Sequence, residues 1–354
     1  MCMNNISGRG VAYNHLILKA LIETIMSDRN TTEVRPKHDF QLGINMPRSS
    51  SITISESAAV GLFFMQRYRF LTIDQYARVT KMNRSTARDQ LRHMQRLGLL
   101  GFFGNAGLIG HGKTPKVYFL TRKGFDLLLS ETDIPEELFG SFKEVKVEAA
   151  WSPQMYHRLR TVDLLISLEV AVQKRPHLTI LNTFLEYRRI KQGNQIIHET
   201  TDFVDAQETA ENKIIPDAAF ILENNQTGKR ALFFLEMDMA TERINSLQVR
   251  NHKTTLHHKF AQYDRYLKSF RYTQKYQAYG EFRSFTMLFV TLQEARIDNI
   301  RRELLDLPKP LAAYYRLSTF DAAMGDFLGV IWQSRLLSDT TRYPLVRDES
   351  AVNG

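Results

Sequence analysis

The first segment of the chain that predicts a packed core begins with apolar residues at helical spacing. One helix is indicated by four residues that share a single face, namely Val60, Phe63, Phe64 and Tyr68. A second helix is predicted over 72–80, because Thr72 and Gln75 have the spacing of a capping box. After a short turn, Ser85 is the expected N-cap of a third helix, which ends at Gly98.

The pattern after the third helix is that of a hairpin. Two strands are predicted, over 99–103 and 117–120, with a Gly-rich basic loop over 104–116 between them. Residues 121–124 then begin a further helix. Three helices followed by strand, loop and strand are the order of a winged helix-turn-helix, and we predict this fold for residues 56–130.

From residue 153 onward, helices and strands alternate in a different order. Residues 193–212 are polar and acidic and predict a loop-like insertion, and the turn at 224–229 is typical of a hairpin. The predicted elements are helix 153–174, strands 178–187, 214–223 and 230–239, helix 256–270, strand 285–292, helix 294–305, strand 314–317 and helix 320–337. This α-β-β-β-α-β-α order predicts an α/β core with a mixed sheet.

The 354 residues are enough for several hydrophobic cores, and we predict a multidomain α/β protein. The expected parts are a flexible N-terminal segment over 1–55 with one short helix at 14–27, the winged helix over 56–130, a linker over 131–152, the α/β domain over 153–340 and a tail over 341–354. No apolar run approaches the roughly 20 residues of a membrane-spanning helix. With Cys2 as the single cysteine, we expect no disulfide, no cysteine zinc site and a cytoplasmic protein.

Positive charge is concentrated in the predicted winged helix. The whole chain carries 47 Lys and Arg against 38 Asp and Glu, a net charge of +9. Residues 60–130 hold 12 of the basic and 3 of the acidic residues, so this fifth of the chain contains the entire excess. A basic patch on a winged helix indicates a nucleic-acid partner rather than a general feature of the surface.

The third predicted helix carries arginines four residues apart, while Ala87, Leu91 and Met94 form the opposite, apolar face. A helix fits the major groove, and the planar guanidinium grips guanine or phosphate with two hydrogen bonds. The alternative is a solvated basic surface. We expect double-stranded DNA to contact the third helix and the wing through Arg84, Ser85, Thr86, Arg88, Asp89, Arg92, Arg96, Lys113 and Lys116.

Three acids mark the predicted hairpin of the second domain. Asp217 follows Pro216 at the start of one strand, and Glu236 and Asp238 lie two apart on the other, so both point to one face. Burying them is costly without compensation, which a Mg²⁺ or Mn²⁺ ion would provide. The alternative is that the acids pair with lysines or arginines and only stabilise the fold.

These motifs resemble those of known DNA-processing proteins. The run Tyr118 to Gly124 resembles the end of many winged-helix regulators, and the acids resemble the PD-(D/E)XK nucleases, with Asp238 in the usual lysine position. The order of motifs resembles the replication-relaxation family and its MobC-type plasmid relaxases over about residues 60–305. That order is Tyr156-His157-Arg158-Leu159, Pro216-Asp217, Phe234 to Glu242 and His258 to Tyr263.

The resemblance implies a restriction-endonuclease-like αβββαβ core and a conjugative relaxase that nicks one strand at a plasmid transfer origin. It implies metal ligation by Asp217, Glu236 and Asp238, a substitute lysine at Lys259, and further site residues at Glu242 and His157. Other relaxosome proteins and a coupling protein are the implied partners. Tyr263 and Tyr266 fit either helix packing or a nucleophilic role.

Two alternatives to the relaxase remain open on the sequence. One is a non-enzymatic replication regulator or relaxosome accessory protein with a degenerate nuclease core, which the absent strand lysine favours. The other is a restriction-type enzyme that cuts both strands, which normally needs paired sites.

Overall fold

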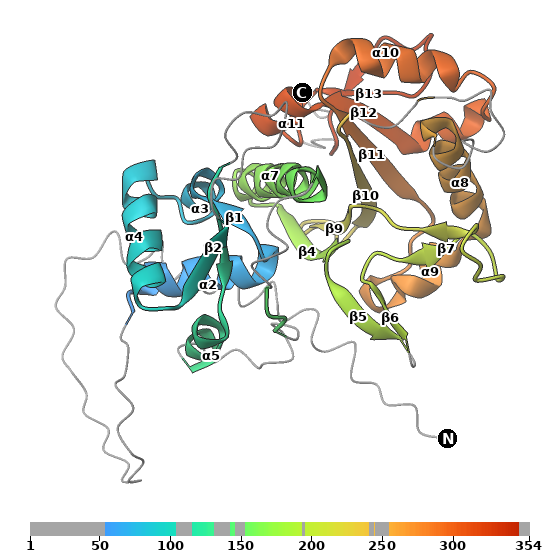
Figure 1. Ribbon diagram of the computed structural model, residues 1–354. Coiled ribbons are helices and arrows are strands. Elements are labelled where there is room, and N and C mark those ends of the chain that lie inside the picture. The colour runs from blue at the N-terminus through green and yellow to red at the C-terminus, as the bar shows by residue number, and fades with distance from the viewer. Residues whose placement is uncertain are drawn as a thin grey trace. The chain divides into compact units, whose positions relative to one another are not determined.

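A computed structural model of the protein describes residues 54–103, 115–130, 142–145, 153–192, 195–240, 244 and 255–346. These residues fall into two compact units, which divide between residues 151 and 152 and are drawn in Figure 1. The short helix expected over 14–27, the loop over 104–114 and most of the expected linker lie outside the described residues.

The N-terminal unit has the topology of a winged helix-turn-helix. Its elements are α2 (Glu56–Tyr68), β1 (Leu71–Thr72), α3 (Ile73–Val79), α4 (Arg84–Arg96), β2 (Leu100–Phe103), β3 (Val117–Leu120) and α5 (Arg122–Ser130). The three strands form an antiparallel sheet in the order β1-β3-β2. The helices and strands predicted for this segment are therefore confirmed.

Local interactions explain where these helices begin and end. The predicted capping box at the start of α3 is present, with Thr72 and Gln75 each bonding the other's backbone N–H. The expected N-cap at Ser85 is wrong, because Asn83 caps α4 by accepting the N–H of Thr86 at 2.9 Å. Gly98 follows α4 at φ +75°, a conformation that costs glycine little.

The C-terminal unit contains a seven-stranded mixed sheet in the order β14-β13-β12-β11-β10-β9-β4. Its helices are α7 (Pro153–Gln173), α8 (Leu256–Ser269), α9 (Arg271–Lys275), α10 (Glu294–Glu303) and α11 (Phe320–Gly325). The sheet strands are β4 (Leu178–Leu185), β9 (Ala218–Asn224), β10 (Arg230–Asp238), β11 (Phe285–Thr291), β12 (Tyr315–Thr319), β13 (Trp332–Gln333) and β14 (Arg342–Tyr343). The central strands β10, β11 and β12 are parallel, and β4, β9 and β10 form an antiparallel meander.

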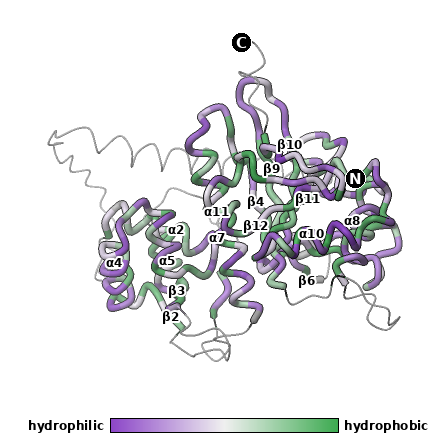
Figure 2. Tube along the Cα trace, turned by 90° about the horizontal axis from the view of Figure 1, so that it is seen from above, coloured by the Kyte–Doolittle hydropathy of each residue, from purple (hydrophilic) through white to green (hydrophobic). Residues whose placement is uncertain are grey.

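Helices cover both faces of this sheet. Figure 1 shows α7 and α11 on one face and α8 and α10 on the other. Alternation along β10 supplies the two cores: Phe233 stacks on Phe220 of β9 at 4.9 Å, whereas Phe234 packs among the aromatic residues of α8. Figure 2 shows that hydrophobic residues gather on the central strands, while α4 of the N-terminal unit is mostly hydrophilic.

Several expectations for this unit are corrected. The helix expected over 320–337 ends at Gly325, because the buried Trp332 instead starts strand β13, next to β12, and donates its indole N–H to Phe327 O at 2.9 Å. Residues 342–343, expected in a tail, pair with that strand. The strand expected over 214–223 is interrupted at Pro216, so its first residues belong to a separate ribbon.

The insertion expected to be loop-like contains two small ribbons. β5 (Arg189–Gln192) pairs with β6 (Gln195–His198), and β7 (Asp202–Phe203) pairs with β8 (Lys213–Ile214). Apolar residues at 190, 196 and 197 sit in a polar stretch and allow strand pairing that its average composition hides. Among the described residues, no helix is long and apolar enough to cross a membrane.

Candidate functional sites

Helix α4 separates an apolar face from a charged one, as its sequence predicts. Ala87, Leu91 and Met94 are fully buried in the N-terminal unit. The seven residues predicted to contact DNA from this helix are exposed, namely Arg84, Ser85, Thr86, Arg88, Asp89, Arg92 and Arg96. The packing of one face thus presents the other to solvent.

Weak ion pairs hold the arginines of this face. Arg84 Nε lies 2.6 Å from Asp74 Oδ1, and Asp89 Oδ1 lies 3.7 Å from Arg88 Nε and 3.9 Å from Arg92 Nη1. These side chains are roughly half to three-quarters exposed, so water screens the pairs and each contributes little. The guanidinium groups can exchange such partners for phosphate oxygens at small cost.

Lys116 extends this surface from the start of β3. Its Nζ lies 3.5 Å from the centroid of the Phe102 ring and donates to Gln95 Oε1 at 3.2 Å. Partial burial and the charge of Arg92 lower the Lys116 pKa. A hollow of about 530 Å³ beside Lys116 carries more positive than negative groups, and its lining is Asp89, Arg92, Gln95, Arg96 and Lys116. Lys113 lies outside the described residues.

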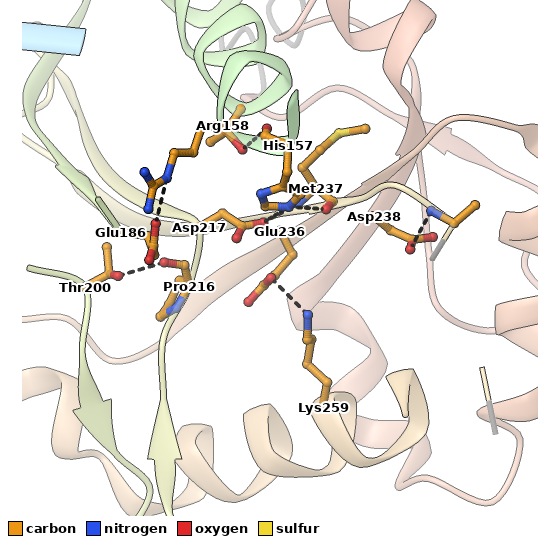
Figure 3. Close-up of polar contacts among 12 residues, drawn as sticks. His157, Arg158, Glu186, Thr200, Pro216, Asp217, Glu236, Met237, Asp238 and Lys259 are labelled. Atoms are coloured by element: carbon orange, nitrogen blue, oxygen red, sulfur yellow. Dashed lines mark hydrogen bonds and ion pairs between the residues drawn. The ribbon is translucent and has the colours of Figure 1, made fainter. Parts of the chain in front are cut away.

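His157 and Asp217 form the centre of the second candidate site, drawn in Figure 3. His157 Nε2 lies 3.2 Å from Asp217 Oδ2 and 2.7 Å from the carbonyl oxygen of Met237. The N–H of Met237 donates to Asp217 Oδ2 at 2.7 Å. Asp217 thereby joins the start of β9 to the end of β10, and His157 joins both to the first turn of α7.

Burial and charge act in opposite directions on this pair. Burial disfavours the imidazolium, but the hydrogen bond and charge of Asp217, the Met237 carbonyl and the charge of Glu236 raise the His157 pKa to about 9. Burial likewise opposes ionisation of Asp217, yet His157, Lys259 and the Met237 N–H lower its pKa. The site therefore holds a charged pair at neutral pH.

Glu236 contacts two residues of α8. Its carboxylate, on a residue that is 4% exposed, lies 3.4 Å from Lys259 Nζ through Oε2 and accepts the Tyr263 hydroxyl at 2.5 Å through Oε1. Burial and the charge of Glu236 hold the Tyr263 pKa well above its ordinary value, so the phenol keeps its proton. The lysine from the following helix and the strand acid thus lie together, on the opposite side of β10 from the Met237 side chain.

Asp238 points to the same face as Glu236 but has different partners. Arg296 of α10 binds its two carboxylate oxygens, through Nε to Oδ2 and through Nη2 to Oδ1 at 3.1 Å. Thr291 Oγ1 donates to Oδ2 at 3.2 Å, and Ala240 N donates to Oδ1 at 3.0 Å. Asp238 is therefore compensated by an arginine 58 residues further along the chain. Glu242 lies outside the described residues.

The three acids expected to bind a divalent cation have different surroundings in the structure. Among the described residues, no three His, Cys, Asp or Glu side chains are grouped to hold a metal ion. Asp217 and Glu236 remain as neighbouring carboxylates beside the Met237 carbonyl, and Mg²⁺ is commonly held by one or two carboxylates plus water and phosphate oxygens. The residues that would hold such an ion are therefore Asp217 and Glu236, while Asp238 is engaged by Arg296.

Two supporting residues carry no local signal in the sequence. Arg296 follows β11, which ends more than fifty residues after Asp238. Glu186 follows β4, the strand that pairs with β9 on the side away from β10. The N–H of Glu186 donates to Asp217 O at 3.0 Å, and its carboxylate lies 3.6 Å from Arg158 Nε. The helix predicted over 294–305 contains several basic residues, and Arg296 is one of the possible partners that it offers Asp238.

The fold and its two sites define a winged-helix protein with a second α/β unit that carries a partly buried cluster of two carboxylates, a histidine and a lysine. The replication-relaxation family matches residues 62–281, more than half of the chain, and the protein belongs to this family. No curated protein matches the sequence.

Solved structures of ZitR from Lactococcus lactis resemble parts of the chain weakly. Wild-type ZitR in complex with DNA is 13% identical, with 45% of this chain and 94% of that chain covered and a TM-score of 0.21. ZitR described as a zinc-responsive MarR family member is 14% identical, with 46% and 100% covered and a TM-score of 0.22. At these scores the likeness carries no argument about this protein.

Proposed function

We propose that this protein binds double-stranded DNA through α4 and nicks one strand at the site of Asp217, Glu236 and Lys259. The observation that carries the proposal is the contact of Lys259 Nζ with Glu236 Oε2 at 3.4 Å, beside Asp217. A lysine next to two carboxylates can support metal-assisted phosphodiester cleavage. Here the lysine comes from α8 because Asp238 occupies its usual strand position.

The exposed face of α4 supports the DNA-binding half of the proposal. Its arginines project from a helix that is packed by its other face, and they keep only screened ion pairs. Arg84 and Arg88 lie in the N-terminal half of α4, the part of a recognition helix whose side chains contact base edges in the major groove. The hollow beside Lys116 supplies positive charge for a phosphate.

The chain's own residues have distinct roles in cleavage. A divalent ion held by Asp217 and Glu236 would supply Lewis-acid stabilisation of the phosphate. Lys259 donates hydrogen bonds to the attacking water or to the charge that develops on the phosphate. Hydrolysis joins the water oxygen to phosphorus, breaks one P–O ester bond and protonates the departing oxygen. Tyr263 fixes one oxygen of Glu236 and leaves the other facing Lys259.

His157 positions Asp217 rather than touching the scissile phosphate. Its Nε2 lies within hydrogen-bond distance of both the Asp217 carboxylate and the Met237 carbonyl, which sets the distance between β9 and β10 at the site. The family supports a role in plasmid replication or mobilisation. We therefore propose a plasmid transfer origin as the DNA, with relaxosome proteins and a coupling protein as partners.

A second candidate is a non-enzymatic regulator of plasmid replication, or a relaxosome accessory protein. The observation that favours it is the Asp238–Arg296 salt bridge. The arginine neutralises a buried carboxylate charge that a metal ion would otherwise neutralise. In that case the acids would stabilise the fold, and the protein would act only by occupying its DNA site.

A supercoiled plasmid that carries the cognate origin separates the two candidates. With Mg²⁺ or Mn²⁺ we expect open circles from the wild-type protein and none when the metal is chelated. Binding without nicking in any metal would support the regulator. Linear product at the first turnover would contradict strand-specific cleavage and indicate a double-strand endonuclease.

A further inference from the structure

The inserted β5–β6 ribbon leaves the C-terminal unit at the end of the sheet that carries Asp217. Strand β4 ends at Leu185, and the N–H of the next residue, Glu186, donates to Asp217 O at 3.0 Å. Strand β5 begins three residues later, and with β6 it forms a two-stranded sheet that Figure 1 shows apart from the seven-stranded one. The four residues of each strand extend the ribbon about 13 Å from its root.

Hydrogen bonds fix the root of this ribbon beside the candidate cleavage site. Glu199 follows β6, and its side-chain Oε2 accepts the N–H of Leu185 at 2.7 Å. The next residue, Thr200, donates its hydroxyl to Pro216 O at 2.7 Å, and Figure 3 shows both residues near Asp217. The ribbon therefore has a defined place relative to Asp217.

The two faces of the ribbon differ. The register pairs Arg189 with His198 and Lys191 with Ile196, so these four positions share one face. Arg189 is exposed and Ile196 is 70% exposed. On the other face, Ile190 lines a hollow of the same unit. The face that carries Arg189 and Ile196 is therefore the one that solvent reaches.

The charge of the ribbon suits a polyanion. Residues 188–198 include three basic residues and no acidic one, whereas the chain outside residues 60–130 carries as many acidic as basic residues. Arg188 lies at the root, with Nη1 3.7 Å from Glu199 Oε1. Arg189 makes no ion pair within the described part of the chain, so its guanidinium can bind a phosphate without losing a partner.

The apolar side chain beside this charge is the second feature of the exposed face. Among the described residues, Ile196 has the largest exposed fraction of the large apolar side chains. A two-stranded ribbon fits the major groove of DNA, where an aliphatic side chain can contact a thymine methyl group. Basic residues at the border of the groove reach phosphates. Isolated exposed apolar residues are common, but here one lies within a basic ribbon attached next to Asp217.

We propose that the β5–β6 ribbon lies in the major groove of the DNA whose strand reaches the Asp217 and Glu236 site, an inference that rests on the proposed function. Ile196 contacts the base edges, and Arg189 contacts a phosphate at the border of the groove. The C-terminal unit thereby holds duplex DNA itself, through a surface that is separate from α4.

The salt dependence of DNA binding tests the two contacts separately. The full chain is titrated into a fluorescently labelled, mixed-sequence DNA duplex, in chelator and at several salt concentrations. Each lost phosphate contact lowers the slope of log affinity against log salt concentration by about 0.9, and we expect this change in Arg189→Gln. Ile196→Ser should weaken binding about tenfold with the slope unchanged, because it removes only an apolar contact.

Matched variants control for a general loss of charge or of apolar surface. Arg302→Gln changes an exposed arginine of the same unit, and Val330→Ser changes an apolar residue that is 62% exposed. Both should bind the duplex like the wild type. The ribbon side chains are exposed, so thermal unfolding of Arg189→Gln and Ile196→Ser should also match that of the wild type.

The possible outcomes separate this inference from the proposed function. Wild-type affinity and slope in both ribbon variants would overturn the inference. Light scattering that shows self-association of the wild type and its loss in Ile196→Ser would also overturn it, because the ribbon would then be an interface between copies of the chain. The expected ribbon effects without nicking of an origin plasmid in Mg²⁺ or Mn²⁺ would defeat the proposed cleavage instead and leave the DNA contact in place.

Discussion

The ammonium of Lys259 on α8 lies 3.4 Å from the carboxylate of Glu236 on β10, although the two residues are 23 positions apart in the chain. The strand position that usually carries a lysine holds Asp238, and an arginine of α10 binds that acid. The cation at the site is thus supplied from α8. This exchange of positions explains how an acid in the usual lysine position is compatible with the proposed cleavage site.

Loss of the Lys259 charge should slow nicking strongly while DNA binding remains. In Lys259→Met we expect a rate about 10² to 10⁴ times lower, the usual contribution of a positioned proton donor or acceptor. The measurement is conversion of supercoiled plasmid together with a binding titration of the same origin fragment. Lys268→Met, an exposed lysine on the same helix, is the control and should nick normally. Equal loss in both variants would contradict a specific role for Lys259.

Removal of Arg296 should destabilise the C-terminal unit. The Asp238 side chain is 1% exposed and that of Arg296 is 15% exposed, so Arg296→Ala leaves a buried carboxylate without its cation. We expect a loss of about 3 kcal/mol in unfolding free energy. Urea denaturation measures it. Adding Asp238→Asn should recover a large part of the loss, and a double variant as unstable as the single one would refute this explanation.

Arg88 should contribute to sequence-specific binding. If it contacts a base edge, Arg88→Ala weakens binding to the cognate site by about 1–3 kcal/mol and relaxes the preference at one position. Titrations with cognate and scrambled duplexes at two salt concentrations measure the effect. Arg302→Ala, an exposed arginine of the other unit, is the control. A loss that is identical for both duplexes would reassign Arg88 to a phosphate contact.

The stability of the metal-free protein should depend on pH through His157 and Asp217. Since the His157 pKa rises from 6.5 to about 9 on folding, its stabilising contribution is complete below pH 6.5 and is lost as pH rises toward 9. The Asp217 pKa is lowered, so its contribution is present above 3.8 and is lost in more acidic solution. Thermal unfolding in chelator should therefore flatten between pH 6.5 and 9 in His157→Gln. The exposed His93→Gln variant should keep the wild-type slope, and a flat wild-type profile would contradict the pair.

Short-range patterns predicted the N-terminal unit well. Helix spacing, the Thr72 capping box and Gly98 depend on neighbours within a few residues, and each is present in the structure. The N-cap at Asn83 was missed because Asn83 and Ser85 are both good capping residues two positions apart. The choice depends on where the turn after α3 directs the chain.

Long-range interactions explain what the sequence did not predict in the C-terminal unit. The pattern of β10 predicted that Glu236 and Asp238 share a face, and the resemblance supplied Lys259. Neither could show that Arg296 pairs with Asp238, because several basic residues follow β11 and packing alone selects one. The helix expected beyond Gly325 fails for the same reason: burying Trp332 in a strand of the sheet outweighs helical periodicity in 320–337.

The most direct test of the account is plasmid nicking by Glu236→Gln. This change keeps the size of the side chain and removes the carboxylate charge that faces Lys259 and that would bind the proposed metal ion. We predict that it binds the origin fragment like the wild type and leaves supercoiled plasmid intact in Mg²⁺ or Mn²⁺. Asp339→Asn, a carboxylate outside the site, should form open circles at the wild-type rate. Open circles from Glu236→Gln at the wild-type rate would contradict the assignment of this site to DNA cleavage.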